Sequence, residues 1–111
     1  MSPLVETEEQ WQAWVIELAE RLGWHWGHFG KCKVGKPGEE RWVTPGTGVL
    51  GVGHPDLILA RGMEVIYVEC KADTGRLRKG QQEWIEIMRA AGLPVYIWRP
   101  RDRHIVQQTL E

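Results

Sequence analysis

The sequence predicts one α/β domain, spanning residues 1–111, with the element order αβββαβ(α). Apolar residues recur at helical spacing near the N-terminus and again between residues 79 and 91. Between and after these segments, short apolar runs bounded by Gly and Pro indicate strands. The length of 111 residues and the apolar fraction of 42% suit one packed domain.

The first helix begins after Thr7. The segment Thr7-Glu8-Glu9-Gln10 fits a capping box, and its acids suit a helix N-terminus. Gly23 is expected to end the helix. The predicted buried stripe consists of Trp11, Trp14, Val15, Leu18 and Leu22.

The segment "WHWGHF", residues 24–29, predicts a strand. Residues 30–54 are rich in Gly, Pro and Lys, and a short hairpin could lie within them. A connection of this length is usually functional or mobile.

Two strands follow, Asp56–Ala60 and Glu64–Lys71, and a two-residue turn at Gly62-Met63 joins them. Gly at the first central position favours a type II′ turn. The numbers of opposed residues then sum to 125, which places Asp56 opposite Glu69. Strand alternation puts Glu69 and Lys71 on one face.

The second helix is predicted from Lys79 to Ala91, with Ile85, Met88 and Ala91 buried and Gly92 at its end. Residues 94–98, "PVYIW", predict a buried strand, and residues 101–110 predict a short last helix.

No window is apolar enough for a membrane span, and the N-terminus lacks the features of a signal peptide. Cys32 and Cys70 do not suggest a disulfide framework, and Cys70 is expected to be a buried thiol. The chain is therefore expected to be cytoplasmic.

The net charge of −1 hides an asymmetry, because residues 71–103 carry eight bases against four acids. These bases could form solvated faces, or they could form patches that bind an acidic polymer such as nucleic acid. The candidate DNA-binding residues are Arg76, Arg78 and Lys79, together with Lys31, Lys33, Lys36 and Arg41 in the middle loop.

Three charged groups converge in the predicted hairpin: Asp56, Glu69 and Lys71. Opposed Cβ atoms lie about 4.5–5.5 Å apart, a gap that Mg²⁺ can span with ligand distances of about 2.1 Å. Without a cation the two carboxylates repel each other, and Lys71 offsets only part of the repulsion. The sequence therefore predicts a metal site beside a lysine, although a solubilising strand face is the alternative.

These residues resemble the PD-(D/E)XK nuclease superfamily, and more narrowly the VRR-NUC (virus-type replication-repair nuclease) family. The similar segments are the first helix ending in "LGW", "GHPD" at 53–56, "ECK" at 69–71 and "KGQQEWIEIMRAAGLPVYIWRP" at 79–100. The resemblance implies a restriction-endonuclease-like core, with a central mixed sheet flanked by helices.

The resemblance also implies roles for individual residues. Asp56, Glu69 and the backbone carbonyl of Cys70 would be metal ligands. Lys71 would orient the attacking water and stabilise the transition state. Gln81 would lie near the active centre, or it would simply be a polar residue at a helix N-terminus.

One departure concerns the first helix, where the family usually places a glutamate facing the metals. That position here is Gln12, and Glu8, one turn earlier, could substitute. Glu17 lies on another face, where an ion pair with Arg21 is the simpler interpretation.

The implied activity is a Mg²⁺-dependent DNA endonuclease, with Mn²⁺ able to substitute, which leaves a 5′-phosphate. Stand-alone relatives are similar to Holliday-junction resolvases and tend to form homodimers. The implied setting is prokaryotic or phage DNA repair or recombination, on branched DNA, with no membrane and no small-molecule substrate.

Three alternatives remain open. The chain could be a catalytically weak or inactive nucleic-acid-binding module, or a protein-interaction domain that uses its tryptophans. His25, His28 and Cys32 could be interpreted as a zinc cluster, but two of them would point to opposite strand faces. His54 could approach the DNA or metal, or only line the loop.

Overall fold

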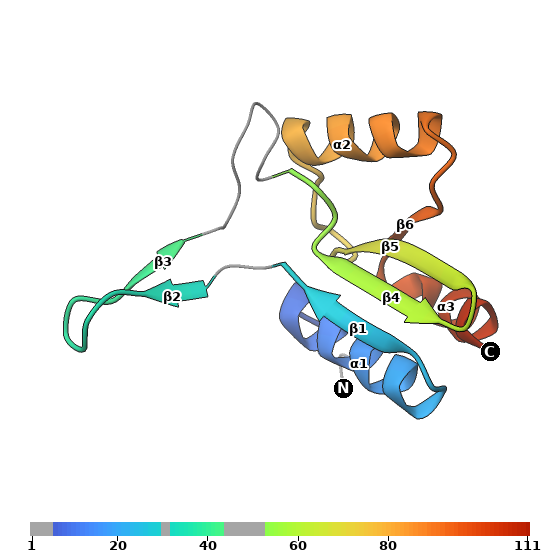
Figure 1. The fold of residues 1–111 in the computed structure, drawn as a ribbon, viewed down its shortest axis with the longest axis horizontal. Helices are drawn as coiled ribbons and strands as arrows, with labels where there is room; N and C mark the ends of the chain where they lie inside the picture. The colour runs from blue at the N-terminus through green and yellow to red at the C-terminus, as the bar shows by residue number, and fades with distance from the viewer. Residues whose placement is uncertain (1–5, 30–31, 44–52) are drawn as a thin grey trace.

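The computed structural model describes residues 6–29, 32–43 and 53–111, except for the side chains of 32–34 and 42–43. Figure 1 shows helices flanking a central sheet. The elements are α1 (Glu8–Arg21), β1 (His25–His28), β2 (Cys32–Val34), β3 (Arg41–Val43), β4 (Leu57–Arg61), β5 (Glu64–Cys70), α2 (Lys79–Ala90), β6 (Val95–Trp98), the 3₁₀ turn η1 (Pro100–Asp102) and α3 (Arg103–Leu110).

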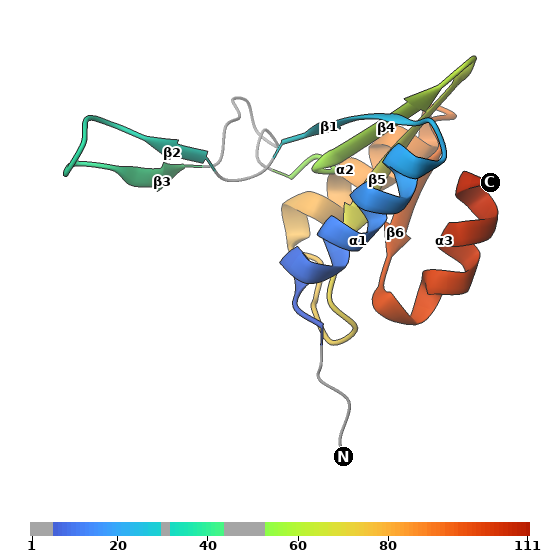
Figure 2. The same ribbon diagram turned by 90° about the horizontal axis from the view of Figure 1, so that it is seen from below.

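The sheet is mixed, as the resemblance to the nuclease superfamily implies. Its strand order is β1-β4-β5-β6. Strand β4 pairs antiparallel with both β1 and β5, and β6 pairs parallel with β5. The hairpin that the sequence allowed within residues 30–54 is present as β2 and β3, which pair only with each other among the described strands. It stands apart from the main sheet in both views (Figures 1 and 2).

The turn between β4 and β5 confirms the predicted register. Leu57 pairs with Val68, and Arg61 pairs with Glu64, so the opposed numbers sum to 125. Gly62 has a φ of +60°, and no described non-Gly residue, Met63 included, has a positive φ. This combination of signs fits the predicted type II′ turn.

The main core lies between the sheet and the helices α1 and α3. The capping box at Thr7 is formed, and Gly23 follows the helix with a φ of +85°, as the sequence predicts. The buried cluster contains Trp11, Val15, Ala19, Trp24, Leu57, Leu59, Ile66, Val68, Cys70, Trp98, Val106 and Leu110. Trp14, Leu18 and Leu22, predicted as buried, are only partly buried against this cluster.

Two details differ from the predictions for α2. Ala91 is exposed rather than buried, because the helix ends at Ala90 and Ala91 is the C-cap residue. Met88 is only partly buried, while Ile85 is buried as predicted. The thiol of Cys70 is buried and free, and burial raises its pKa, so it is a core residue rather than a nucleophile.

None of the helices in the described part of the chain has the length and apolar character needed to span a membrane.

Arg61 links the end of β4 to two other elements. Its guanidinium donates hydrogen bonds to the carbonyls of Leu22, Leu110 and Glu111, at 3.0, 2.8 and 3.1 Å. It also lies over the Trp24 ring, 4.5 Å from the centroid. One charged side chain thus joins the ends of α1 and α3 to the sheet.

We expect Arg61→Ala to lower the free energy of unfolding by about 1.5–3 kcal/mol, because hydrogen bonds from a charged group are lost. Urea denaturation followed by circular dichroism measures the change. Arg21→Ala is the control, because the exposed Arg21–Glu17 pair contributes only about 0.5 kcal/mol. Equal stabilities of the two variants would contradict the role given to Arg61.

Candidate active site

The antiparallel pairing of β4 and β5 brings Asp56 and Glu69 together. Asp56 precedes β4, one step beyond the Leu57–Val68 pair, so the register places it opposite Glu69. Glu69 is only 1% exposed, and Asp56 is partly buried. Two carboxyl groups are therefore held face to face in a poorly solvated position.

Burial is the main influence on both carboxyl groups. The pKa of Glu69 is raised to about 8, mainly by burial and further by the charge of Asp56, while Lys71 and Arg78 oppose the shift. Burial also raises the pKa of Asp56, against the opposing effects of His28 and the hydrogen bond from Gln12. The field at this point of the molecule favours a bound positive charge.

Two carboxylate oxygens here have no hydrogen-bond partner. Within the described residues, Asp56 Oδ1 and Glu69 Oε1 are the buried side-chain polar atoms that lack one. Leaving such atoms unsatisfied is costly, so native structures do so mostly where an ion, water or substrate binds.

Helix α1 places two side chains over the carboxyl groups. Gln12 Nε2 donates to Asp56 Oδ2 at 3.3 Å, and Glu8 Oε1 lies 3.5 Å from Lys71 Nζ. Both residues therefore face the carboxyl pair, as the helical spacing predicts. Glu17 instead pairs with Arg21 at 3.1 Å, which confirms the simpler interpretation of that residue.

The residues present fit a divalent cation by the chemistry of their oxygens. The two unpartnered carboxylate oxygens are hard anionic ligands of the kind that Mg²⁺ and Mn²⁺ prefer. In the described residues, however, no group of three or more His, Cys, Asp or Glu side chains could hold a metal by itself. A cation here would need further oxygens from backbone, amide, water or substrate, which is usual for Mg²⁺.

His28 is a residue that the sequence did not connect with the carboxyl pair. Its Nε2 lies 3.9 Å from Asp56 Oδ2. The approach depends on the pairing of β1 with β4, which joins strands about 30 residues apart and has no local signal in the sequence. His25, on the same strand, is exposed.

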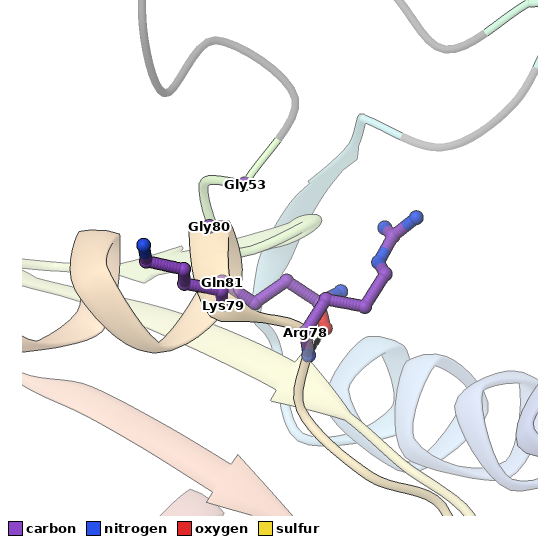
Figure 3. Close-up of a pocket in the computed structure, with 5 residues that line it drawn as sticks. All are labelled: Gly53, Arg78, Lys79, Gly80 and Gln81. Carbon is purple, nitrogen blue, oxygen red and sulfur yellow. Dashed lines mark hydrogen bonds between the residues drawn. The ribbon is translucent and has the colours of Figure 1, made fainter.

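Gln81 acts as a helix cap in this structure. Its Oε1 accepts a hydrogen bond from the backbone N–H of Arg78 at 2.9 Å. It also lines a cavity of about 300 Å³ with Gly53, Arg78, Lys79 and Gly80 (Figure 3). The side chains of Arg78 and Lys79 extend in different directions from this helix end (Figure 3).

The glycine at position 53 lets the segment before Asp56 approach α2. A Cβ on Gly53 would lie 2.4 Å from the Gly80 carbonyl group and 2.9 Å from Trp84 Cδ1. No residue other than glycine fits without moving the helix. This close approach to α2 explains why glycine occupies the first position of "GHPD".

The basic residues divide into two groups. Arg76, Arg78 and Lys79 are exposed, and so are Lys36 and Arg41 on the β2–β3 hairpin. Lys31 lies outside the described residues, and so does the side chain of Lys33.

Several other bases within residues 71–103 have structural partners, so their charge is partly used within the fold. Arg89 donates to the carbonyl of Val95, and Arg103 pairs with Glu6 and lies over Trp11 and Trp14. Arg99 Nη1 donates to the carbonyls of Ala72 and Gly75, each at 2.6 Å, and so fixes the loop after Lys71.

Comparison with family models settles the relationship: residues 6–102 match the VRR-NUC domain. The chain belongs to the VRR-NUC family. It therefore has a PD-(D/E)XK-like fold and is a member of a nuclease family, for which DNA is the implied substrate. No curated protein and no solved structure matched the chain.

The pKa of Glu69 predicts a pH dependence of stability. Between its ordinary value of 4.5 and about 8, the folded protein binds more protons at this site than the unfolded chain does. Without metal, the free energy of unfolding should therefore fall as pH rises through this window. We expect Glu69→Gln to flatten the fall, as measured by urea denaturation in EDTA between pH 5 and pH 9.

Glu17→Gln is the matched control, because Glu17 is exposed. Its pH profile should follow that of the wild type. Parallel profiles for the wild type and Glu69→Gln would show that Glu69 is not a strained carboxyl group.

Proposed function

We propose that this chain is a divalent-metal-dependent, structure-selective DNA endonuclease. The observation that carries the proposal is the pair of buried, unpartnered carboxylate oxygens on Asp56 and Glu69. They lie at the positions that match the acidic residues of the family's motif, and Lys71 follows on the same strand. The reaction class is hydrolysis of a phosphodiester bond.

In this proposal Asp56, Glu69 and the carbonyl of Cys70 would hold Mg²⁺ or Mn²⁺. The cation would supply positive charge that polarises the phosphoryl group and lowers the pKa of the attacking water. Gln12 and Glu8 are further candidates for ligands, directly or through water. Gln12 would be the weaker ligand, because its amide is neutral whereas Glu8 is a carboxylate. The Gln12 amide also already donates a hydrogen bond to Asp56.

Lys71 would act beside the carboxyl pair as a positive group with several N–H donors. The Lys71 Nζ atom lies 3.5 Å from Glu8 Oε1. The positive charge of Lys71 also lowers the pKa of Glu69. From this position the ammonium group can orient a water molecule and stabilise negative charge that develops on the phosphate. Because Lys71 is nearly buried, its charge is poorly screened and acts strongly.

The finer parts of the proposal come from the resemblance to stand-alone relatives. They are a 5′-phosphate product, branched DNA such as a Holliday junction, and a homodimer in a prokaryotic or phage setting. Symmetric cutting of two strands requires two active sites. One chain offers one carboxyl pair, so two copies would be needed.

A second candidate is a nucleic-acid-binding module with little or no activity. Gln12 favours it, because an amide at this position contributes no charge toward a cation. A cleavage assay with Mg²⁺ or Mn²⁺, over branched, nicked and linear DNAs, separates the candidates. Binding without cleavage in every case would support the module.

We expect Asp56→Asn, Glu69→Gln and Lys71→Met each to reduce cleavage by about 100-fold or more, because each removes a charge from the reacting centre. Gln12→Ala should reduce cleavage less than Glu69→Gln does. Glu17→Gln serves as the control and should cleave at the wild-type rate. If one of the three folded variants cleaved DNA at the wild-type rate, the residue that it replaces would not belong to the active centre.

Metal binding gives a readout that does not depend on cleavage. Added Mn²⁺ should raise the melting temperature of the wild type, because it binds only the folded state. The same addition should leave Glu69→Gln nearly unchanged. An equal rise in both proteins would place the ion elsewhere.

The exposed bases at the start of α2 and just before it predict contacts with the DNA backbone. Replacing Arg76, Arg78 and Lys79 together by alanine should weaken binding to duplex DNA and flatten its salt dependence by up to about three units of slope, since each phosphate contact contributes about 0.9. Fluorescence anisotropy over a range of salt concentrations measures the slope. Sequence preference should not change, because phosphates carry no base information.

The double variant Lys36→Ala with Arg41→Ala tests the β2–β3 hairpin by the same measurement. If the salt dependence of DNA binding were unaltered in the triple variant and flattened in the double variant, the contact with the DNA backbone would be assigned to the hairpin.

A further inference from the structure

Three aromatic rings form a row beside Asp56. The rings of Phe29 and His54 meet edge to face, with centroids 5.4 Å apart and an interplanar angle of 83°. His54 and Trp84 meet in the same way, at 6.4 Å and 83°. Such edge-to-face pairs stabilise one another, so the row is a defined arrangement.

Two residues of the row, Phe29 and His54, lie next to Asp56 along the backbone or through a backbone hydrogen bond. The N–H of Phe29 donates to the carbonyl of Asp56 at 2.6 Å, and His54 precedes Asp56 by two residues. His54 Nδ1 lies 3.0 Å from the carbonyl oxygen of Pro55. Trp84 comes from α2, which Gly53 allows to approach closely. Backbone contacts therefore connect the row of rings to Asp56 at its Phe29 and His54 end.

Phe29 ends the row and is 46% exposed. A phenylalanine has no polar group that would gain from contact with water, so this exposure disfavours the isolated protein. Trp26, which is 44% exposed, differs because its indole N–H donates to Glu20 at 2.7 Å. Among the described residues, Phe29 is thus an exposed aromatic ring with no polar group of its own, on a residue whose backbone is hydrogen-bonded to Asp56.

We propose that Phe29 stacks on an unpaired base of the DNA next to the scissile phosphate, and that His54 and Trp84 hold its ring in place. The proposal rests on the proposed nuclease function and names its substrate class. Aromatic rings stack on bases of any sequence, and each stacked base contributes about 1–3 kcal/mol.

A base within an intact duplex offers no free face, because its neighbours already cover both faces. Stacking on Phe29 therefore requires a nucleotide that has left the duplex, as at a flap, a junction or a single-stranded end. The ring would select such DNA without reading its sequence. The exposed side chains of Arg76, Arg78 and Lys79, around the start of α2, suit the phosphates of the same strand.

The experiment compares binding of the full chain to a short labelled oligothymidylate and to a blunt duplex of equal length, in EDTA so that nothing is cleaved. Phe29→Ala and Phe29→Leu should weaken single-strand binding about 5- to 150-fold, the equivalent of one stacked base. Duplex binding should change by less than about twofold, because duplex affinity comes mainly from phosphate contacts. Phe29→Tyr retains a ring and should bind both DNAs like the wild type.

Ile105→Ala is the matched control, since Ile105 is 55% exposed on α3 and away from the row. It should bind both DNAs like the wild type. A single strand that contains 2-aminopurine gives an independent signal. Its fluorescence should be quenched on binding to the wild type and to Phe29→Tyr, and remain high with Phe29→Leu.

Equal losses for single strand and duplex, or no loss with Phe29→Leu, would overturn the proposal. A change from dimer to monomer in Phe29→Ala, seen by size-exclusion chromatography, would also overturn it, by assigning the ring to contact with a second copy. The measurement is independent of cleavage. Failure of the stacking proposal therefore leaves the nuclease proposal intact, and failure of the nuclease proposal is recognised separately in the cleavage assay.

Discussion

The burial of two facing carboxyl groups, Asp56 and Glu69, is the constraint on which the rest of the candidate site depends. Two acids at facing strand ends, one of them almost fully buried, disfavour the folded state unless positive charge is near. The surrounding groups reduce this cost: Lys71 and Arg78 act on Glu69, and His28 and Gln12 act on Asp56. The remaining unsatisfied oxygens are what a cation would relieve. Stability in the metal-free state and affinity for a cation are therefore opposed at this site.

The scaffold keeps the carboxyl pair from relaxing. Separation of the two groups would require a shift of the β4–β5 register, which would move Leu57 and Val68 out of the core. Arg99 holds the loop after Lys71 through two carbonyls, so the lysine cannot easily withdraw into solvent. The strain of the carboxyl pair is thus balanced by apolar burial and hydrogen bonds elsewhere, as is common at functional sites.

Sequence reasoning predicted the features that depend on local signals. The capping box at Thr7, the turn at Gly62-Met63 and the register that opposes Asp56 and Glu69 all follow from residues close in the chain. It missed contacts between distant segments: His28 near Asp56, Arg99 on the 72–75 loop, and Gly53 against Gly80. Such contacts depend on tertiary geometry, for which a single sequence carries no periodic signal. The prediction that Ala91 is buried was wrong for a related reason. Ala91 is the C-cap residue of α2, and a residue at a helix end can leave the packed face.

Gln12 shows how a single amide changes the balance at the site. An amide donates to Asp56 Oδ2, whereas a carboxylate at this position would add another negative charge beside Asp56, Glu69 and Glu8. The amide therefore stabilises the metal-free protein and lowers the negative potential that attracts a cation. Glu8 then becomes the residue on α1 that carries charge toward the site, but it is already paired with Lys71. Any contribution of Glu8 to a cation would weaken its hold on the lysine, so ligation and positioning of Lys71 are coupled through this one carboxylate.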